Sequence, residues 1–304
     1  MQVKIEGLYL RGGGFLKASN LIKKRTGIFL PYFEGERLKD FPQALVNILD
    51  KENISYYDGR YRSTDIAYHL YSVPEDLLSM VHSRDMINMV KRTGYFETAL
   101  YSAGGTVQAA EEMFRGNIDN AFVFTGVGDH HAGRNFFGGM CYFNGAALAI
   151  AALRIRGVRR FAIVDTDSHH ADGTRDIFYD DKEVLHVCFC FQDYRDDNNN
   201  IDIAIPYGTN DNDYLQKFRE EFVPSVSTFH PEVIFWEFGY DATQGEYGDK
   251  GITRDFHLEV VKIIKATADE ICQCRLISIL CGGSSRALAT YIIPRIISHM
   301  AELD

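Results

Sequence analysis

The sequence of 304 residues lacks any run of about 18 apolar residues, so no membrane-spanning helix is expected. Its first residues also lack the charged head and the long apolar core of a signal peptide. We find no internal repeat, no low-complexity tract and no stretch with the composition of a linker. We therefore expect a cytoplasmic protein without membrane contacts, with residues 1–304 forming a single domain.

Basic residues are in the minority, and the net charge is −10 at pH 7. This argues against direct binding of nucleic acid, which usually needs a basic balance or a basic stripe. An acidic surface suits a cationic partner, such as a lysine-rich tail or a polyamine. Solubility alone explains the same charge, so the partner class needs further support.

Cysteines are few and do not have the spacing of a zinc ribbon. None of the six stands in a C-x-x-C pair. The two C-x-C pairs lie within the apolar runs "LHVCFCF" and "ICQCRLISIL". We therefore expect buried free thiols in a reducing compartment.

From about residue 120, short apolar runs alternate with segments of helical spacing. The runs are residues 121–126, 160–165, 183–191, 232–239 and 275–280. Strands that are apolar on both faces and alternate with helices predict a mostly parallel sheet covered by helices on both sides, an α/β fold. The first 120 residues are less regular, and the polar stretch "DYRDDNNN" (193–200) is interpreted as a surface loop.

Polar or glycine-rich segments follow four of these runs, where α/β proteins place their ligands. The segments are "VGDHHAGRNFFGG", "TDSHHADG", "YDATQGEYGD" and "CGGSS". Each pattern alone is common in proteins without a site. Their occurrence after four separate strands favours a functional site at the carboxyl edge of the sheet.

The segment "DTDSHHAD" contains a pattern that can bind a metal ion. Asp165, Asp167 and His169 stand at i, i+2 and i+4, so in an extended chain they point to the same side, whereas His170 and Asp172 point the other way. Asp241, after another strand, could supply a third ligand. One imidazole and two carboxylates leave a position open for water, as in a catalytic rather than a structural site.

The adjacent residues His130 and His131 cannot easily ligate the same ion, but they can act near it as general base and general acid. Each would need an acceptor on its other ring nitrogen, and Asp165 and Asp172 are available for this.

These segments resemble the zinc-dependent histone deacetylase superfamily, which includes acetylpolyamine amidohydrolases and acetoin-utilisation proteins and shares its fold with arginases. The resemblance rests on residues 130–150, 164–181, 239–249 and 281–289, in the order of the family. It implies a sheet of about eight strands. It also implies zinc-dependent hydrolysis of an acyl-amide of the N-acyl-lysine or acylpolyamine type.

The resemblance also implies roles for individual residues. Asp167, His169 and Asp241 match the zinc ligands. His130 and His131 match the catalytic pair, with Asp165 and Asp172 behind them. Gly139 matches the glycine whose carbonyl accepts the substrate amide N–H, and Met140 stands where the family usually has a Phe along the acyl-lysine tunnel. A structural K⁺ near Asp165, Asp167 and His169 would also be usual.

The sequence departs from the family at Ser284, where a Tyr normally donates a hydrogen bond to the oxyanion. The shorter Ser side chain cannot reach the same point, and loss of one such donor typically costs about 10²–10³ in rate. We therefore expect weak activity on simple acetyl-lysine, unless Tyr247, Arg286 or a Tyr of the N-terminal region substitutes.

Two other functions remain open on the sequence. Ser284 would suit a non-catalytic acyl-lysine-binding protein that retains its zinc site, although a binder has no need of both the ligands and the His pair. An arginase-like hydrolase with two Mn²⁺ ions would need further bridging carboxylates, and the His-His-Ala-Gly sequence fits the deacetylase branch better.

Overall fold

The computed structural model describes residues 23–31, 35–58, 72–126 and 129–303. Its strands are β1 (Thr26–Leu30), β2 (Ile54–Asp58), β3 (Asn120–Val123), β4 (Phe161–Asp165), β5 (Val184–Cys190), β6 (Tyr194–Arg195), β7 (Asn200–Ala204), β8 (Val233–Phe238) and β9 (Leu276–Leu280). Within the described residues they form one sheet in the order β2-β1-β3-β9-β8-β4-β5-β7-β6. Every neighbouring pair is parallel except β6 with β7.

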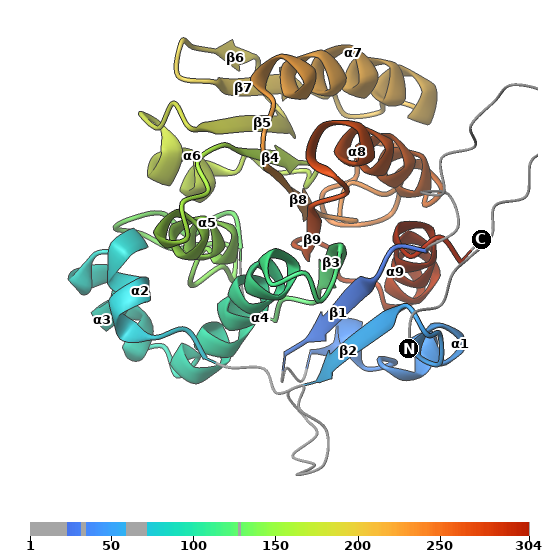
Figure 1. The fold of residues 1–304 in the computed structure, drawn as a ribbon. Helices are drawn as coiled ribbons and strands as arrows, with labels where there is room; N and C mark the ends of the chain where they lie inside the picture. Colours follow the sequence, from blue (N-terminus) through green and yellow to red (C-terminus); the bar gives the residue numbers. More distant parts are fainter. Residues whose placement is uncertain (1–22, 32–34, 59–71, 127–128, 304) are drawn as a thin grey trace, which may run out of the picture.

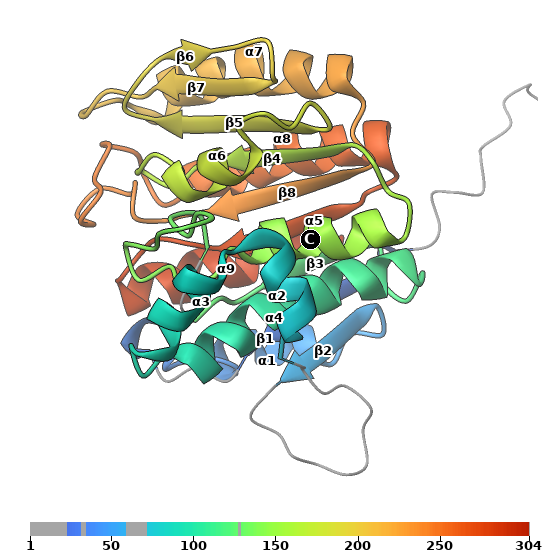
Figure 2. The ribbon, with the colours of Figure 1, turned by 90° about the vertical axis from the view of Figure 1, so that its left-hand side faces the viewer.

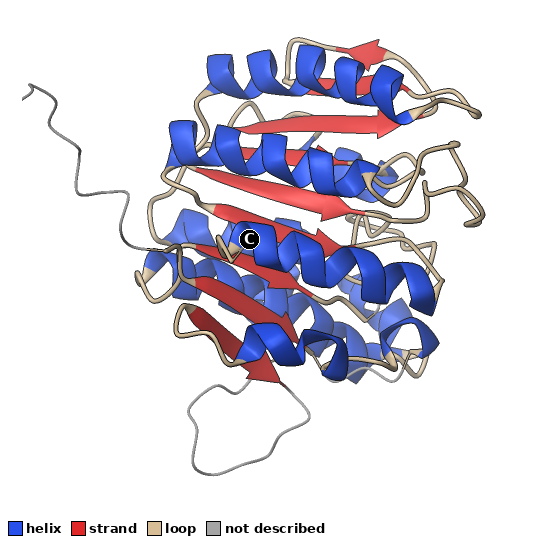
Figure 3. Ribbon diagram, turned by 90° about the vertical axis from the view of Figure 1, so that its right-hand side faces the viewer, coloured by secondary structure: helices blue, strands red, loops and turns tan. Residues whose placement is uncertain are grey.

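Helices cover both faces of this sheet (Figures 1 and 2). The helical elements are η2 (Glu36–Leu38), η3 (Gln43–Leu45), α1 (Val46–Leu49), α2 (Glu75–Val81), α3 (Arg84–Lys91), α4 (Phe96–Phe114), α5 (Gly145–Ile155), α6 (Asp172–Phe178), α7 (Asp211–Phe229), α8 (Phe256–Cys272) and α9 (Arg286–Met300). Helices α2 to α6 lie on one face, and α1, α7, α8 and α9 lie on the other (Figure 3). The predicted α/β fold, with helices on both faces of a mostly parallel sheet, is confirmed.

Strand β4 shows why its sequence is apolar throughout. Phe161 and Ile163 pack in the core under α4 and α5, whereas Ala162 and Val164 pack in the core under α7 and α8. Successive side chains of a strand point to opposite faces, so a strand with helices on both sides needs apolar residues at every position.

The structure corrects two interpretations of the sequence. The stretch 193–200 is not only a loop, because it contains β6 and the start of β7. Its polar composition suits a hairpin at the sheet edge, where Asp196 accepts hydrogen bonds from the backbone N–H groups of Asn198 and Asn200. The first 120 residues, which are less regular in sequence, supply the two strands β1 and β2.

Two expectations about composition can also be compared with the structure. All six cysteines are buried and free, as expected. Among the described residues, no helix combines the length and the apolar character that crossing a membrane would require.

His82, which follows α2, fastens the loop that carries His130 and His131. Its Nδ1 lies 2.8 Å from the carbonyl oxygen of Gly133, and the N–H of Asn144 donates to its Nε2 at 3.1 Å. These contacts require a neutral imidazole that donates from Nδ1. Burial lowers the pKa of His82 to about 4, because the charged form would lose its hydration.

We expect the free energy of unfolding to fall as the pH drops from about 6.5 toward about 4. In this range His82 binds a proton in the unfolded chain but stays neutral in the folded protein. The contribution of neutral His82 to the free energy of unfolding is complete above the pKa of His82 in the unfolded chain. It is lost as the pH falls toward the pKa of His82 in the folded protein. In urea denaturation at a series of pH values, His82→Gln should flatten this slope by up to about 1.4 kcal/mol per pH unit. His230→Asn, at an exposed left-handed position that Asn tolerates, should not. Equal slopes for His82→Gln and the unchanged protein would contradict the assignment.

Candidate active site

The four polar segments singled out in the sequence follow strands that are neighbours in the sheet. Strands β3, β9, β8 and β4 are consecutive, and their parallel direction brings their carboxyl ends to one edge, where the loops gather (Figure 3). All four segments line one cavity of about 560 Å³, together with residues of the loop at η2.

Asp167, His169 and Asp241 direct one ligand atom each toward a common point. Nδ1 of His169 lies 2.9 Å from Oδ1 of Asp167 and 3.0 Å from Oδ2 of Asp241. Both carboxylates are buried, whereas the imidazole borders the cavity. Hydrogen bonds to Asp167 and Asp241 raise the pKa of His169 to about 10. The group therefore attracts positive charge, whether as a proton on His169 or as a metal ion.

The surroundings of this group fit a divalent metal ion. The backbone N–H of Gly282 donates to Oδ2 of Asp167 at 2.7 Å, and the Ser168 hydroxyl donates to Oδ2 of Asp241 at 2.6 Å. Such contacts orient ligands in metal sites. A Cβ added to Gly239 or Gly282 would collide with Oδ2 of Asp167, so both positions leave room only for glycine. An imidazole with two carboxylates is a donor set suited to catalytic zinc with an open position.

His130 and His131 are each paired with a carboxylate. Nδ1 of His130 lies 2.6 Å from Oδ2 of Asp165, and Nδ1 of His131 lies 2.5 Å from Oδ1 of Asp172. The two rings lie 4.1 Å apart, and both border the cavity. Burial opposes ionisation of Asp172, but the hydrogen bond with His131, the charges of His131 and His130 and the N–H of Gly173 together outweigh it and lower the Asp172 pKa. These pairings leave Nε2 of each ring as the nitrogen that can exchange a proton.

Glu237, on β8, is a residue of this site that the sequence analysis missed. It pairs in register with Asp165 and groups with His130 and Asp165. Burial first, and then the charge of Asp165, raise the Glu237 pKa. The Thr174 hydroxyl donates to its Oε1 at 2.9 Å. The signal was one acidic residue inside the otherwise apolar strand "VIFWEF".

Gly139 and Met140 form a turn on the cavity wall, both with positive φ, at 54° and 64°. A Cβ on Gly139 would press against the ring of His131. The Met140 side chain is exposed rather than packed in the core. Both residues line the cavity, and the roles that the resemblance implies for them stay predictions.

Ser284 also borders the cavity, but its side chain is committed to Glu246. The Ser284 hydroxyl donates to Oε2 of Glu246 at 2.8 Å. The backbone N–H groups of Ser284 and Ser285 donate to the same carboxylate, at the N-terminus of α9. Ser284 thus helps to fix a loop and does not aim its hydroxyl at the ligand group.

Tyr247, next to Glu246 in the chain, brings a phenol to this wall of the cavity. Its hydroxyl accepts a hydrogen bond from the N–H of Gly283 at 2.9 Å, and its ring stacks on that of His169 at 5.7 Å. Tyr247 is 63% exposed as a whole residue, but desolvation of its phenol against the cavity wall, followed by the charges of Asp241 and Asp167, raises the Tyr247 pKa. The phenol therefore keeps its proton at neutral pH and can donate it in a hydrogen bond.

Of the other two candidate replacements for the missing Tyr, Arg286 does not line the cavity. Arg286 pairs instead with Asp40, with Nη2 2.5 Å from Oδ1. The N-terminal segment 1–22 lies outside the described residues. A different arginine, Arg37, borders the cavity and donates to the carbonyl oxygen of Gly283 at 3.1 Å. Nothing in the sequence around Arg37 indicated this position.

The fold and the arrangement of the site define the class of protein. Residues 75–300 match the histone deacetylase domain family, and this match covers well over half of the chain. The chain belongs to this family. In the crystal structure of the HDA15 HD domain, 90% of that chain superposes on 92% of this one with a TM-score of 0.76. At 20% identity this likeness establishes the fold.

Curated relatives agree with the family. A protein of Archaeoglobus fulgidus described as a probable deacetylase is 31% identical over 229 residues, which are 69% of this chain and 63% of the relative. Acetylpolyamine amidohydrolase 1 of Pseudomonas aeruginosa is 44% identical over 87 residues, which are 29% of this chain and 25% of the relative. The chain thus aligns with less than two thirds of the length of these relatives.

We expect Gly282→Ala to weaken binding of a divalent metal by about 10–100-fold, because the added methyl group displaces Asp167. Competition with a chelator of known affinity measures this. The matched control is Gly138→Ala, where an added Cβ meets no atom within 4 Å. Unchanged affinity in Gly282→Ala would contradict the proposed location of the ligand group.

Proposed function

We propose that this protein hydrolyses the acyl-amide bond of an acylated amine, of the N-acyl-lysine or acylpolyamine type. Family membership and the descriptions of the relatives as deacetylase and acetylpolyamine amidohydrolase support this reaction class. The observation that carries the proposal is that a three-ligand group and two His–Asp pairs border one cavity. Amide hydrolysis needs both an activated carbonyl and positioned proton carriers. We also propose that the chain works as one domain, since a single sheet collects its strands.

Asp167, His169 and Asp241 would hold a zinc ion. When bound there, zinc would polarise the acyl carbonyl and make water a better nucleophile. Its position, next to the His pair, is supported by the separation of 3.8 Å between Nε2 of His130 and Oδ1 of Asp167. The structural K⁺ implied by the resemblance remains a separate prediction.

His130 and His131 would carry the proton. One imidazole accepts a proton at Nε2 from water while the water oxygen bonds to the acyl carbon. The C–N bond then breaks, and a protonated imidazole donates from Nε2 to the leaving amine nitrogen. Asp165 and Asp172 hold Nδ1–H of the two rings and stabilise the imidazolium that forms, as the Asp of a catalytic triad does.

Tyr247 would supply the oxyanion donor that Ser284 cannot. Its hydroxyl already contacts the N–H of Gly283, the residue before Ser284, and its ring rests on His169. A phenol that reaches the Gly-Gly segment from another loop can donate to the same developing charge. Arg37, through the carbonyl oxygen of Gly283, would keep this wall in position.

The acylated amine would lie along the wall formed by Gly139 and Met140, where the Gly139 carbonyl would accept the substrate N–H. Glu36 borders the same cavity, and the chain has a net charge of −10. Both favour a cationic carrier such as a lysine-rich segment or a polyamine over an anionic one.

Zinc content and deacylation should be measured on one preparation, with a panel of acyl-lysines and acylpolyamines of increasing acyl length. We expect chelation to abolish acyl release, zinc to restore it and a hydroxamate to inhibit it. His131→Gln should reduce kcat by about 10²–10⁴-fold without loss of zinc, because a general acid–base group is removed. No acyl release from any member of the panel by fully zinc-loaded protein would refute the proposed function.

Tyr247→Phe should reduce kcat by about 10²–10³-fold with little change in KM, because an oxyanion donor acts in the transition state. Ser284→Ala should have a much smaller effect, since its hydroxyl contacts Glu246. Tyr101→Phe, on the exposed side of α4, is the matched control. If Ser284→Ala lost as much activity as Tyr247→Phe, the oxyanion donor would have to be reassigned.

A further inference from the structure

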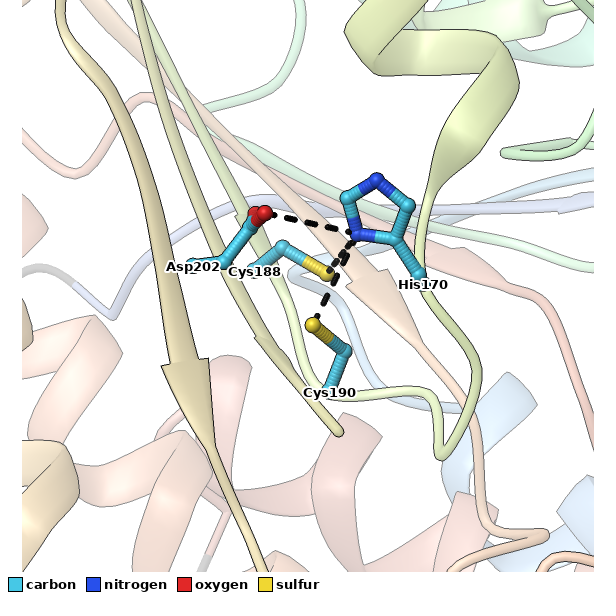
Figure 4. A group of neighbouring side chains, drawn as sticks. All are labelled: His170, Cys188, Cys190 and Asp202. Atoms are coloured by element: carbon cyan, nitrogen blue, oxygen red, sulfur yellow. Dashed lines mark hydrogen bonds and ion pairs between the residues drawn. The ribbon is translucent and has the colours of Figure 1, made fainter. Parts of the chain in front are cut away.

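His170 follows the ligand His169 in the chain, but it faces a different group of side chains. Its ring points toward Cys188 and Cys190 of β5 and toward Asp202 of β7 (Figure 4). The two thiols and the carboxylate are buried, and the His170 side chain is 18% exposed. None of these four residues belongs to the candidate active site.

The strands place three of the four side chains next to each other. Cys188 and Cys190 stand at i and i+2, so both thiols point from the same face of β5. Asp202 is the register partner of Cys188 on the neighbouring strand β7. His170 reaches the same face from the segment between β4 and α6. The group therefore rests on the sheet, with only its fourth member on a loop.

The distances suit ligands around a shared ion, and the two contacts with sulfur are also within hydrogen-bonding reach. Nδ1 of His170 lies 3.6 Å from Sγ of Cys190, 3.9 Å from Sγ of Cys188 and 3.7 Å from Oδ2 of Asp202. The separation from Oδ2 of Asp202 exceeds the length of a nitrogen–oxygen hydrogen bond, about 2.7–3.2 Å. With bonds of about 2.3 Å to sulfur and about 2.0–2.1 Å to nitrogen, neighbouring ligand atoms of a tetrahedral zinc site lie about 3.5 Å apart.

The carboxylate of this group is already oriented. Nη2 of Arg175 lies 2.5 Å from Oδ1 of Asp202, and Nε2 of Gln192 lies 2.8 Å from Oδ2. Partners of this kind fix metal-bound carboxylates. Two thiolates and one carboxylate carry three negative charges, which a divalent ion and the Arg175 guanidinium balance.

We propose that His170, Cys188, Cys190 and Asp202 form a second metal site, which binds a thiophilic divalent ion of the zinc class. Four protein ligands fill the coordination of such an ion, so the site is structural rather than catalytic. It ties the segment that carries Asp167 and His169 to strands β5 and β7. The proposal does not depend on the proposed function, because the two sites share no ligand.

Zinc should be counted on the reduced full-length chain after equilibration with a fixed concentration of free Zn²⁺. We expect two ions per chain. The variant Cys188→Ser/Cys190→Ser should hold one, Asp241→Asn should hold one, and their combination should hold none. The matched control Cys272→Ser/Cys274→Ser changes the other buried C-x-C pair and should keep two.

Cobalt distinguishes the two sites, because only the second has thiolate ligands. Co²⁺-loaded protein should show thiolate-to-cobalt charge-transfer absorption that persists in Asp241→Asn and disappears in Cys188→Ser/Cys190→Ser. If that double variant does not fold, His170→Ala, at the one partly exposed ligand, should weaken binding of the second ion by about 10–100-fold.

Three results would overturn the proposal. The first is a single zinc ion in the unchanged protein that Cys188→Ser/Cys190→Ser retains. The second is loss of both ions in Asp241→Asn, as expected of a dinuclear site with shared ligands. The third is the absence of thiolate-to-cobalt absorption in protein whose Cys188 and Cys190 titrate as free thiols, which would leave the pair as ordinary buried cysteines.

Discussion

The constraint on which the rest of this structure depends is the burial of several carboxylates at one edge of a sheet. Asp165, Asp167 and Asp241 are at most 1% exposed, although like charges out of water raise one another's pKa and cost several kcal/mol unless they are paired. The chain offsets this with donors on rigid elements. Nδ1 of His130 forms a hydrogen bond with Asp165, and the N–H of Gly282 donates to Asp167. The charge that remains favours a cation at the carboxyl end of β4 and β8.

The same constraint also shapes the cavity wall at Ser284, where the family usually has a Tyr. Glu246 is a further carboxylate near the site, and it is satisfied by three donor groups at the start of α9, including the Ser284 hydroxyl. These hydrogen bonds fix the position of Glu246 and of the next residue, Tyr247. The Tyr247 ring stacks on His169, and its hydroxyl accepts a hydrogen bond from the N–H of Gly283. The Ser284 hydroxyl, with the backbone N–H groups of Ser284 and Ser285, thus holds the loop of Tyr247, the proposed oxyanion donor.

The sequence was sufficient to predict the α/β fold and the segments that meet, because both follow from local periodicity and strand order. Asp165, Asp167 and His169 could be named from their spacing, although residues 167–169 form a bend and not the extended chain that the spacing predicted. The sequence offered Tyr247 as one of three substitutes for the missing Tyr but could not rank them, because the position of the Tyr247 hydroxyl depends on the path of a loop. Arg37 could not be found, because its contacts join residues 246 positions apart. Short edge strands such as β6 escape periodicity altogether, since two residues have no measurable pattern.

The adjacent residues His169 and His170 show how one short segment can serve two groups of ligands. Residues 167–169 form a bend after β4, and the two side chains part there: His169 borders the cavity, whereas His170 faces β5 and β7. His169 stands on a loop, where it contacts Asp167, Ser168, Asp241 and Tyr247. An ion bound by His170 would fix the same backbone to the sheet from behind. Rigid ligands bind metal in one geometry, so the second group would set the precision of the first.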